Sequence, residues 1–212
     1  YQILSSLEDA TSELSEKGLI LKPRVEAAYR LFKQGVEIPV RTQGCAYKPE
    51  SGRVMYTVHS TPIFNSNGYS TRTRGVAEGM KKQGGDVVVV ARSGYPWDSS
   101  VDIKKPAQKR YSESLNGVTY VHTPGGNLNR DGLDSYVLKA ADTFVREATL
   151  LRPSVIQSAS NHRTALPALI AARRVGVPFV YEVRGLWEIT EITKRPSLKG
   201  SERFNAQVQL ET

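Results

Sequence analysis

Cysteine is nearly absent from this sequence, which has only Cys45 among its 212 residues. A single cysteine cannot form a disulfide within the chain, so a disulfide-stabilised secreted scaffold is excluded and a reducing compartment is expected. Long hydrophobic runs are missing too. The longest, residues 87–91, is far shorter than the roughly 18–20 apolar residues that a membrane-spanning helix needs. We therefore expect a cytoplasmic protein.

Several signatures of catalysis and metal binding are also missing. His59, His122 and His162 are far apart in the sequence, and one cysteine cannot supply a zinc cluster, so we expect no metal. The chain contains no G-x-G-x-x-G fingerprint, no G-x-S-x-G elbow and no Walker loop. These absences argue against a zinc enzyme, a serine hydrolase and a P-loop nucleotidase, and they weaken the case for a dinucleotide-binding enzyme.

Positive charge is present in excess, because 29 Lys and Arg against 21 Asp and Glu give a net charge of +8. Residues 1–50 hold seven of each sign, so the whole excess belongs to residues 51–212. A basic domain suits a phosphorylated substrate, an anionic membrane surface or nucleic acid. The same excess of charge is also found in proteins where it only maintains solubility, so the charge alone does not identify a partner.

The two parts of the chain differ in pattern as well. In residues 1–50, apolar residues at helical spacing predict two helices, one ending near Gly18 and one running from Pro23 to Gly35, followed by a linker. In residues 51–212, apolar segments alternate with amphipathic ones. We expect strands near residues 54–58, 87–91, 118–121, 155–156 and 179–183, and helices near 71–83, 133–151, 165–175 and from 202 onward. The expected fold class is α/β, a Rossmann-like, doubly wound, mostly parallel sheet preceded by a short helical arm.

Open α/β sheets bind ligands beyond the carboxyl ends of their strands, so the residues that follow the expected strands are the candidates. After the first strand, a loop of small polar residues opens onto a helix start, where N–H groups and the positive end of the helix dipole suit a phosphate or sugar hydroxyls. Its candidate substrate-binding residues are Asn67, Gly68, Tyr69 and Arg72. The alternative is a surface turn in which Ser70 or Thr71 caps the helix.

Two later strand ends carry further candidates. After the fourth strand, His162 lies where an imidazole can donate to a sugar hydroxyl or move a proton, and Arg163 is beside it. After the fifth strand, Arg184 offers a planar fork for phosphate or carboxylate, and Glu188 offers an acceptor for hydroxyl groups. The alternatives are a helix cap at Asn161 and an internal ion pair at Arg184.

Taken in order, these segments resemble the N-terminal domain of a retaining glycosyltransferase of family 4. The resemblance covers residues 53–212 and leaves the helical arm outside. Its most specific part is the last, in which strand, polar loop, Pro-containing helix and strand follow one another. The stretches that carry it are NSNGYSTRTRGVAEGM, VVVVARSGYPWD and PSVIQSASNHRTALPALIAARRVGVPFVYEVRGLWE.

The resemblance implies the GT-B architecture, in which two Rossmann-like domains face each other across a cleft. The N-terminal domain holds a glycan or lipid-linked acceptor, and the C-terminal domain holds the nucleotide-sugar. A hexosyl group is transferred with retention of configuration, without a metal or other cofactor, while the leaving phosphate assists the incoming hydroxyl. The resemblance also implies cell-envelope polysaccharide biosynthesis, with peripheral contact at the inner face of the membrane and no nucleic acid partner.

Within this resemblance, His162 corresponds to the family's sugar-contacting catalytic histidine, although many members carry that histidine nearer positions 157 and 159. Members also have two glutamates eight positions apart in the donor domain. The only such pair here is Glu8 and Glu16, in the helical arm. We therefore expect the donor-binding domain to be absent from this chain, residues 51–212 to bind the acceptor, and the chain alone to transfer nothing.

Two other functions stay open from the sequence. Arg92, at the end of the second expected strand, suits the 2′-phosphate of NADP, which would make the chain an NADP-linked oxidoreductase domain. The basic residues of 104–110, which lie near Tyr95 and Trp97, suit a non-enzymatic module that binds nucleic acid or a membrane surface.

Overall fold

The computed structural model describes residues 16–211 apart from residues 45, 100–103, 160 and 186. The first helix expected in the arm and Cys45 lie outside the described residues. The described part contains a six-stranded sheet with the strand order β3-β4-β2-β1-β5-β6. Its strands are β1 (Arg53–Val58), β2 (Asp86–Ala91), β3 (Tyr111–Leu115), β4 (Val118–His122), β5 (Val155–Ala159) and β6 (Phe179–Glu182).

Every neighbouring pair of strands is parallel except β3 with β4, so the expected doubly wound, mostly parallel sheet is confirmed. The helices are α2 (Glu16–Gln34), α3 (Gly68–Lys82), α4 (Leu133–Leu151), α5 (His162–Val175), α6 (Trp187–Lys194) and α7 (Glu202–Glu211), with a short 3-10 helix at Pro196–Leu198.

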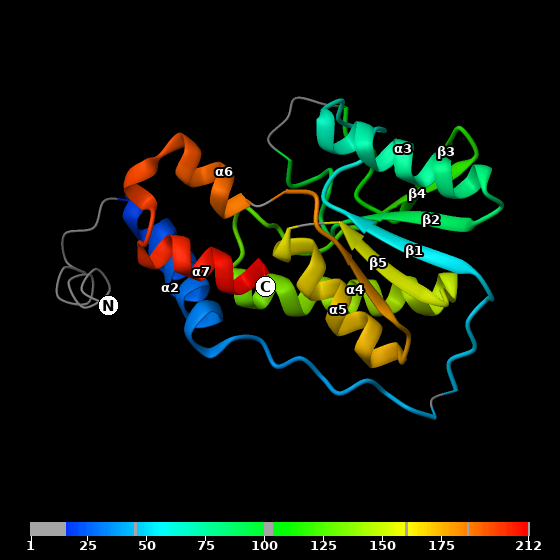
Figure 1. Cartoon of the computed structure of the whole chain (residues 1–212), viewed down its shortest axis with the longest axis horizontal. Helices are drawn as coiled ribbons and strands as arrows, with labels where there is room; N and C mark the ends of the chain where they lie inside the picture. The colour runs from blue at the N-terminus through cyan, green and yellow to red at the C-terminus, as the bar shows by residue number, and fades with distance from the viewer. Residues whose placement is uncertain (1–15, 45, 100–103, 160, 186, 212) are drawn as a thin grey trace.

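Helices cover both faces of the sheet, α3 on one face and α4 with α5 on the other (Figure 1). Strand β2 shows why, because its valines alternate between the two faces. Val87 and Val89 join the core under α3, whereas Val90 joins the core under α4 and α5. A central strand that is apolar on both faces needs a helix layer on each side.

The direction of the connections fixes where a ligand crevice lies. After β1 the chain forms β2, β3 and β4, which all lie on one side of β1, and it then returns to the other side of β1 to form β5 and β6. The connections therefore diverge between β1 and β5. In sheets of this kind the crevice for ligands lies at that point, outside the carboxyl ends of the strands.

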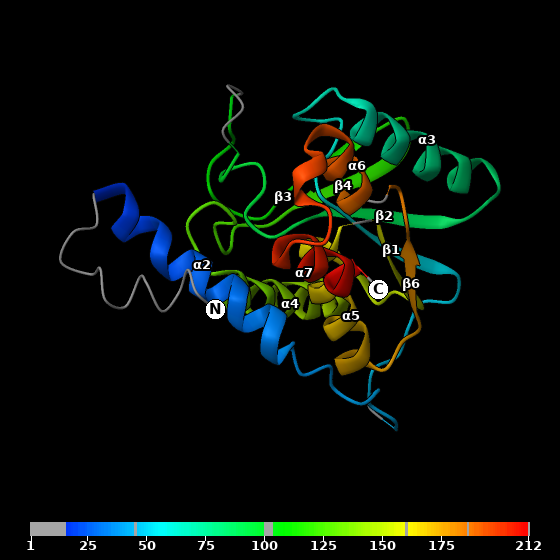
Figure 2. The same ribbon diagram turned by 60° about the vertical axis from the view of Figure 1, so that its left-hand side comes forward.

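Two expectations about single elements are wrong. The arm was expected to break between Gly18 and Pro23, but α2 runs through both residues. Proline inside a helix removes one backbone hydrogen bond, and α2 continues because it packs on α4 and buries Ala27 and Leu31 there (Figure 2). The second concerns residues 111–115, where no strand was expected and which form the antiparallel edge strand β3.

Candidate functional site

The loop after β1 ends in a capping box at the start of α3. The Asn67 Oδ1 atom accepts from the backbone N–H of Ser70 at 2.9 Å, and the Ser70 Oγ atom accepts from the N–H of Asn67 at 3.0 Å. The N–H groups of Gly68 and Tyr69 find no acceptor among the described residues. The capping that the sequence left as an alternative is therefore present, and two N–H groups stay open to a ligand.

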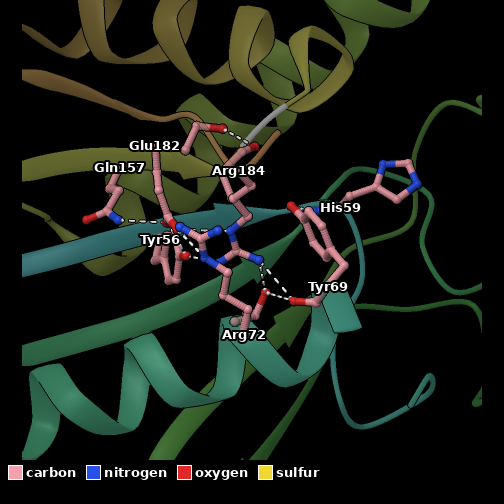
Figure 3. Close-up of polar contacts among 10 residues, drawn as sticks. Tyr56, His59, Tyr69, Arg72, Gln157, Glu182 and Arg184 are labelled. Carbon is pink, nitrogen blue, oxygen red and sulfur yellow. Dashed lines mark hydrogen bonds and ion pairs between the residues drawn. The ribbon is translucent and has the colours of Figure 1, made fainter. Parts of the chain in front are cut away.

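Arg184, just beyond β6, lies under this first turn of α3. Its guanidinium donates to Glu182 Oε1 at 3.0 Å, to the Tyr69 carbonyl at 2.9 Å and to Thr73 Oγ1 at 2.8 Å. It also donates to the Tyr56 hydroxyl and lies 4.5 Å from the centre of the Tyr69 ring. Only 5% of the Arg184 side chain is exposed. The internal ion pair that the sequence left as an alternative is thus present, and it ties β6 to α3 (Figure 3).

Glu182 is the acceptor at the centre of this network. It accepts from the Tyr56 hydroxyl and from Gln157 Nε2 at 3.2 Å, and Arg72 lies 3.5 Å away (Figure 3). Burial opposes ionisation of Glu182, but the hydrogen bonds from Tyr56 and Arg184 outweigh it and lower the pKa of the carboxyl group. The carboxylate is therefore charged, and Arg184 balances it. We refer to Tyr56, Tyr69, Thr73, Glu182 and Arg184 as the α3 clamp.

Arg72 keeps most of its guanidinium in solvent. Its side chain is 52% exposed and meets the clamp only at the 3.5 Å contact with Glu182. Of the two arginines expected to bind substrate in this region, Arg72 is thus open to a ligand, whereas the fork of Arg184 faces protein acceptors. Substrate contact by Arg72, Gly68 and Tyr69 stays a prediction.

The start of α5 lies after β5, on the other side of the crevice. Asn161 caps this helix, because its side-chain oxygen accepts from the N–H of Arg163 at 3.2 Å. His162 is the first residue of α5 and is 7% exposed, while Arg163 is exposed. A role for His162 and Arg163 in substrate binding stays a prediction. Glu188 lies on α6, and its side chain is outside the described structure.

The same edge of the sheet holds buried polar atoms that lack a hydrogen-bond partner among the described residues. They include His59 Nδ1 after β1, Asp98 Oδ1 after β2, Thr123 Oγ1 after β4 and Thr164 Oγ1 in the first turn of α5. A buried polar atom without a hydrogen bond costs about 1–3 kcal/mol. Such atoms follow four different strands, so unmet hydrogen-bonding capacity collects at this edge, which is where ligands bind in sheets of this kind. Sequence reasoning did not select His59, although its position directly after a central strand was the available signal.

Arg92, on which the NADP hypothesis rested, is 4% exposed and forms an ion pair with Asp98. The Asp98 Oδ2 atom also accepts from the N–H of Leu128 at 3.1 Å. Because the Arg92 charge is buried and balanced within the protein, it is not presented to a 2′-phosphate. The hypothesis of an NADP site therefore loses the residue that supported it.

The basic loop after Trp97 is also partly engaged. Arg110 forms a forked ion pair with the buried Glu147, with its closest contact at 2.9 Å. The Lys105 ammonium donates to the carbonyls of Trp97 and Ser99. Lys104 and Lys109 are exposed, and their side chains form no hydrogen bond or ion pair with the residues that the structure describes.

Next to the carboxyl edge, an open groove of about 470 Å³ lies between the loop after β4 and the side of α4. Its charges are balanced, since two carboxylates and two cations line it together with two glycines, an amide and a hydroxyl. The lining residues are Gly125, Gly126, Asn127, Asp131, Lys139, Asp142, Thr143 and Arg146. Such a lining offers hydrogen-bond donors and acceptors and little apolar surface.

Two further observations describe the part of the chain that the structure covers. No helix there is both long and apolar enough to span a bilayer. Within the same residues, no group of three or more His, Cys, Asp or Glu side chains gathers in a way that could hold a metal ion.

Comparison with known proteins identifies the family. A search of curated proteins found no significant match. The family model described as "Glycosyl transferase 4-like domain" matches residues 67–209, which run from the N-cap of α3 to α7 and include the β5, α5 and β6 segments on which the resemblance rested. With two thirds of its length matched, the chain belongs to the family of glycosyl transferase 4-like domains and is a transferase domain that acts on a sugar donor and an acceptor.

Proposed function

We propose that residues 51–212 form the acceptor-binding domain of a retaining glycosyltransferase whose donor is a nucleotide-sugar. The observation that carries the proposal is the set of partnerless polar atoms at the carboxyl edge of the sheet, next to the open N–H groups of Gly68 and Tyr69. Hydroxyl groups of a sugar can supply both donors and acceptors to such atoms. A glycan or the sugar of a lipid-linked acceptor therefore fits this edge.

Positioning and charge stabilisation account for transfer in this proposal. The N-terminus of α3 and the exposed Arg72 provide positive charge beside the crevice, where a leaving diphosphate gains negative charge as the glycosidic bond breaks. The acceptor hydroxyl is held on the same face of the sugar and gives its proton to the leaving phosphate. The new bond then forms with retention of configuration, and no protein nucleophile takes part.

His162 and Arg163 line the opposite side of the crevice in this proposal and contact the acceptor or the transferred sugar. The donor nucleotide binds a second Rossmann-like domain that faces this edge. The balanced groove beside α4 gives a longer glycan acceptor room to continue away from the crevice. Contact with the inner face of the membrane is the corresponding proposal for a lipid-linked acceptor.

The test uses two assays on the full chain. Calorimetric titration with oligosaccharides and with UDP- and GDP-sugars measures binding, and radiolabelled nucleotide-sugars with the same acceptors measure transfer. We expect oligosaccharide binding and no transfer. Efficient transfer by this chain alone would contradict the domain role, and a lack of glycan binding would contradict the acceptor role. In an enzyme that contains this domain, the anomeric configuration of the product tests retention.

A further inference from the structure

The three histidines of the chain have different surroundings. His122 is fully buried, with Nε2 at 2.9 Å from Thr61 Oγ1 and the Phe64 ring 4.9 Å from its own ring centre. His162 is also buried and has an interaction partner within the protein. His59 differs, because its recorded hydrogen bond uses the backbone N–H and neither ring nitrogen has a partner among the described residues.

His59 also has a distinctive position in the sheet. It directly follows β1, which lies between β2 and β5, so it stands where the chain connections diverge and the crevice is expected. Its Nδ1 atom is enclosed by protein and still lacks a hydrogen bond. The Nδ1 atom of His122 is unpartnered as well, but the Nε2 atom of His122 lies next to Thr61, whereas the Nε2 atom of His59 has neither a partner among the described residues nor full enclosure and is the nitrogen that a ligand can reach.

The α3 clamp holds the His59 ring in place. The backbone N–H of His59 donates to the Tyr69 hydroxyl at 3.0 Å, and the two rings meet edge to face with 6.2 Å between their centres. Arg184 in turn holds Tyr69 through its carbonyl and its ring face. Figure 3 shows the His59 ring on the far side of Tyr69 from Arg184, outside the ion-pair network. The clamp therefore positions the ring, and it leaves the ring nitrogens without a hydrogen bond to the described residues.

We infer that His59 is a further ligand-binding residue of this site and that its imidazole hydrogen-bonds a hydroxyl group of a pyranose ring. The inference rests on the proposed function, because it names a contact within the same crevice. It adds a residue that neither the family match nor the strand-end argument selected, since the match begins at residue 67.

The charge state of His59 agrees with a hydroxyl as its partner. Burial, together with the positive charges of Arg92 and Arg163, lowers the pKa of the His59 imidazole to about 3. The ring is therefore neutral at physiological pH, with one nitrogen as donor and the other as acceptor. A hydroxyl group can donate or accept, so it suits the accessible ring nitrogen in either tautomer, whereas a phosphate is better matched by a cation. So low a pKa also excludes a general base that works near neutral pH.

The decisive experiment is NMR on the chain with ¹⁵N-labelled histidine. The probes are methyl α-D-glucopyranoside, methyl α-D-mannopyranoside and methyl α-D-galactopyranoside, with inorganic phosphate for comparison. The ring signals of His59 are assigned from their loss in His59→Gln. We expect at least one hexoside to shift these signals and phosphate to leave them unchanged. In His59→Ala, the dissociation constant for that hexoside should rise about 3- to 10-fold, the effect of one lost hydrogen bond.

Two control variants separate binding from folding. Lys82→Ala changes an exposed residue in the last turn of α3 and should keep the hexoside affinity of the original chain. His59→Leu removes the unpartnered ring, so the midpoint of thermal unfolding without ligand should stay the same or rise, while hexoside binding weakens. A large fall in that midpoint would show that His59 serves the fold and would overturn the inference.

Failure of the inference can be told apart from failure of the proposed function. A hexoside that shifts the backbone amides of Asn67 or Gly68 but leaves the His59 ring signals unchanged overturns the role of His59 alone. If neither hexosides, oligosaccharides nor nucleotide-sugars shift any signal at this edge of the sheet, the proposed function fails and the role of His59 fails with it.

Discussion

Among single side chains, the ion pair of Arg184 and Glu182 makes the clearest prediction. Arg184→Ala would leave the Glu182 carboxylate, which is 16% exposed, with only the longer 3.5 Å contact to the half-exposed Arg72 as an ion pair. Removing one partner of a buried pair costs about 3–5 kcal/mol. We expect the lower end, about 3 kcal/mol, in the free energy of unfolding measured with urea, because Tyr56 and Gln157 still donate to the carboxylate.

A surface arginine on α3 provides the matched control. Arg74 is 47% exposed and lies 3.8 Å from Glu78 one helical turn away. Arg74→Ala should change the free energy of unfolding by about 0.5 kcal/mol or less, as is usual for exposed pairs. Equal losses in the two variants would contradict a supporting role for the α3 clamp.

His122 predicts how stability responds to acid. Burial lowers its pKa from 6.5 to about 4 in the folded chain, so between these pH values the unfolded chain binds a proton that the folded chain does not. Stability is therefore complete above pH 6.5 and falls as the pH drops toward 4, by about 3 kcal/mol at 1.4 kcal/mol per pKa unit. Urea unfolding at a series of pH values measures the slope. His122→Gln should remove this contribution and leave that of His59, whose pKa is also lowered by burial, so the slope should become shallower; an unchanged slope would refute the assignment.

At the level of helices and strands, hydrophobic pattern predicted the buried elements and missed the exposed ones. β2 is apolar on both faces, so its sequence alone indicates a covered parallel strand. β3 is an edge strand with mostly exposed polar residues, and its pairing with β4 leaves no hydrophobic signal. α2 runs through Pro23 because packing on α4 outweighs the local preference to break, and a local reading of the sequence contains no information on that packing.

The loops at the carboxyl edge of the sheet pack tightly against each other, and adding one methyl group tests how tightly. Gly94, after β2, has a φ of +88°, and a Cβ atom built there would lie 2.1 Å from the carbonyl oxygen of Gly126 in the loop after β4. Gly94→Ala thus combines backbone strain with a clash against main chain, and we expect a loss of at least about 2 kcal/mol in the free energy of unfolding. Circular dichroism during thermal unfolding measures it.

In the control variant, the free energy of unfolding should change in the opposite direction. Gly75 lies inside α3, where a Cβ atom would meet nothing within 4 Å. Gly75→Ala should stabilise the chain by about 0.5–1 kcal/mol, because alanine is the better helix former. A tolerated Gly94→Ala would show that the two loops separate easily and that the edge of the sheet is less rigid than the structure indicates.

At the scale of the whole molecule, the sequence predicted which residues lie at the carboxyl edge of the sheet but not how their side chains are organised. Strand ends identified Asn67, Arg184 and His162, because parallel strands bring their carboxyl ends together. The sequence could not decide that Arg184 turns inward to Glu182 and Tyr56, since that depends on how β6 and α3 meet in space. His59 could not be selected from the sequence, because the lack of a hydrogen bond to its ring depends on which residues surround it in the folded chain.

The uneven charge of the chain leads to a prediction about its two kinds of ligand. The net charge of +8 belongs to the α/β part, so binding of UDP, a multiply charged anion that represents the leaving group, should weaken several-fold when the salt concentration rises from low to above physiological levels. Binding of methyl hexosides should not change with salt, because a neutral ligand gains nothing from the field. Arg72→Ala should reduce the salt dependence for UDP, and Lys82→Ala, at the far end of α3, should leave it intact. Calorimetric titration at several salt concentrations measures the dissociation constants of both ligands. Equal salt dependence for UDP and hexosides would mean that charge has no part in selecting the donor.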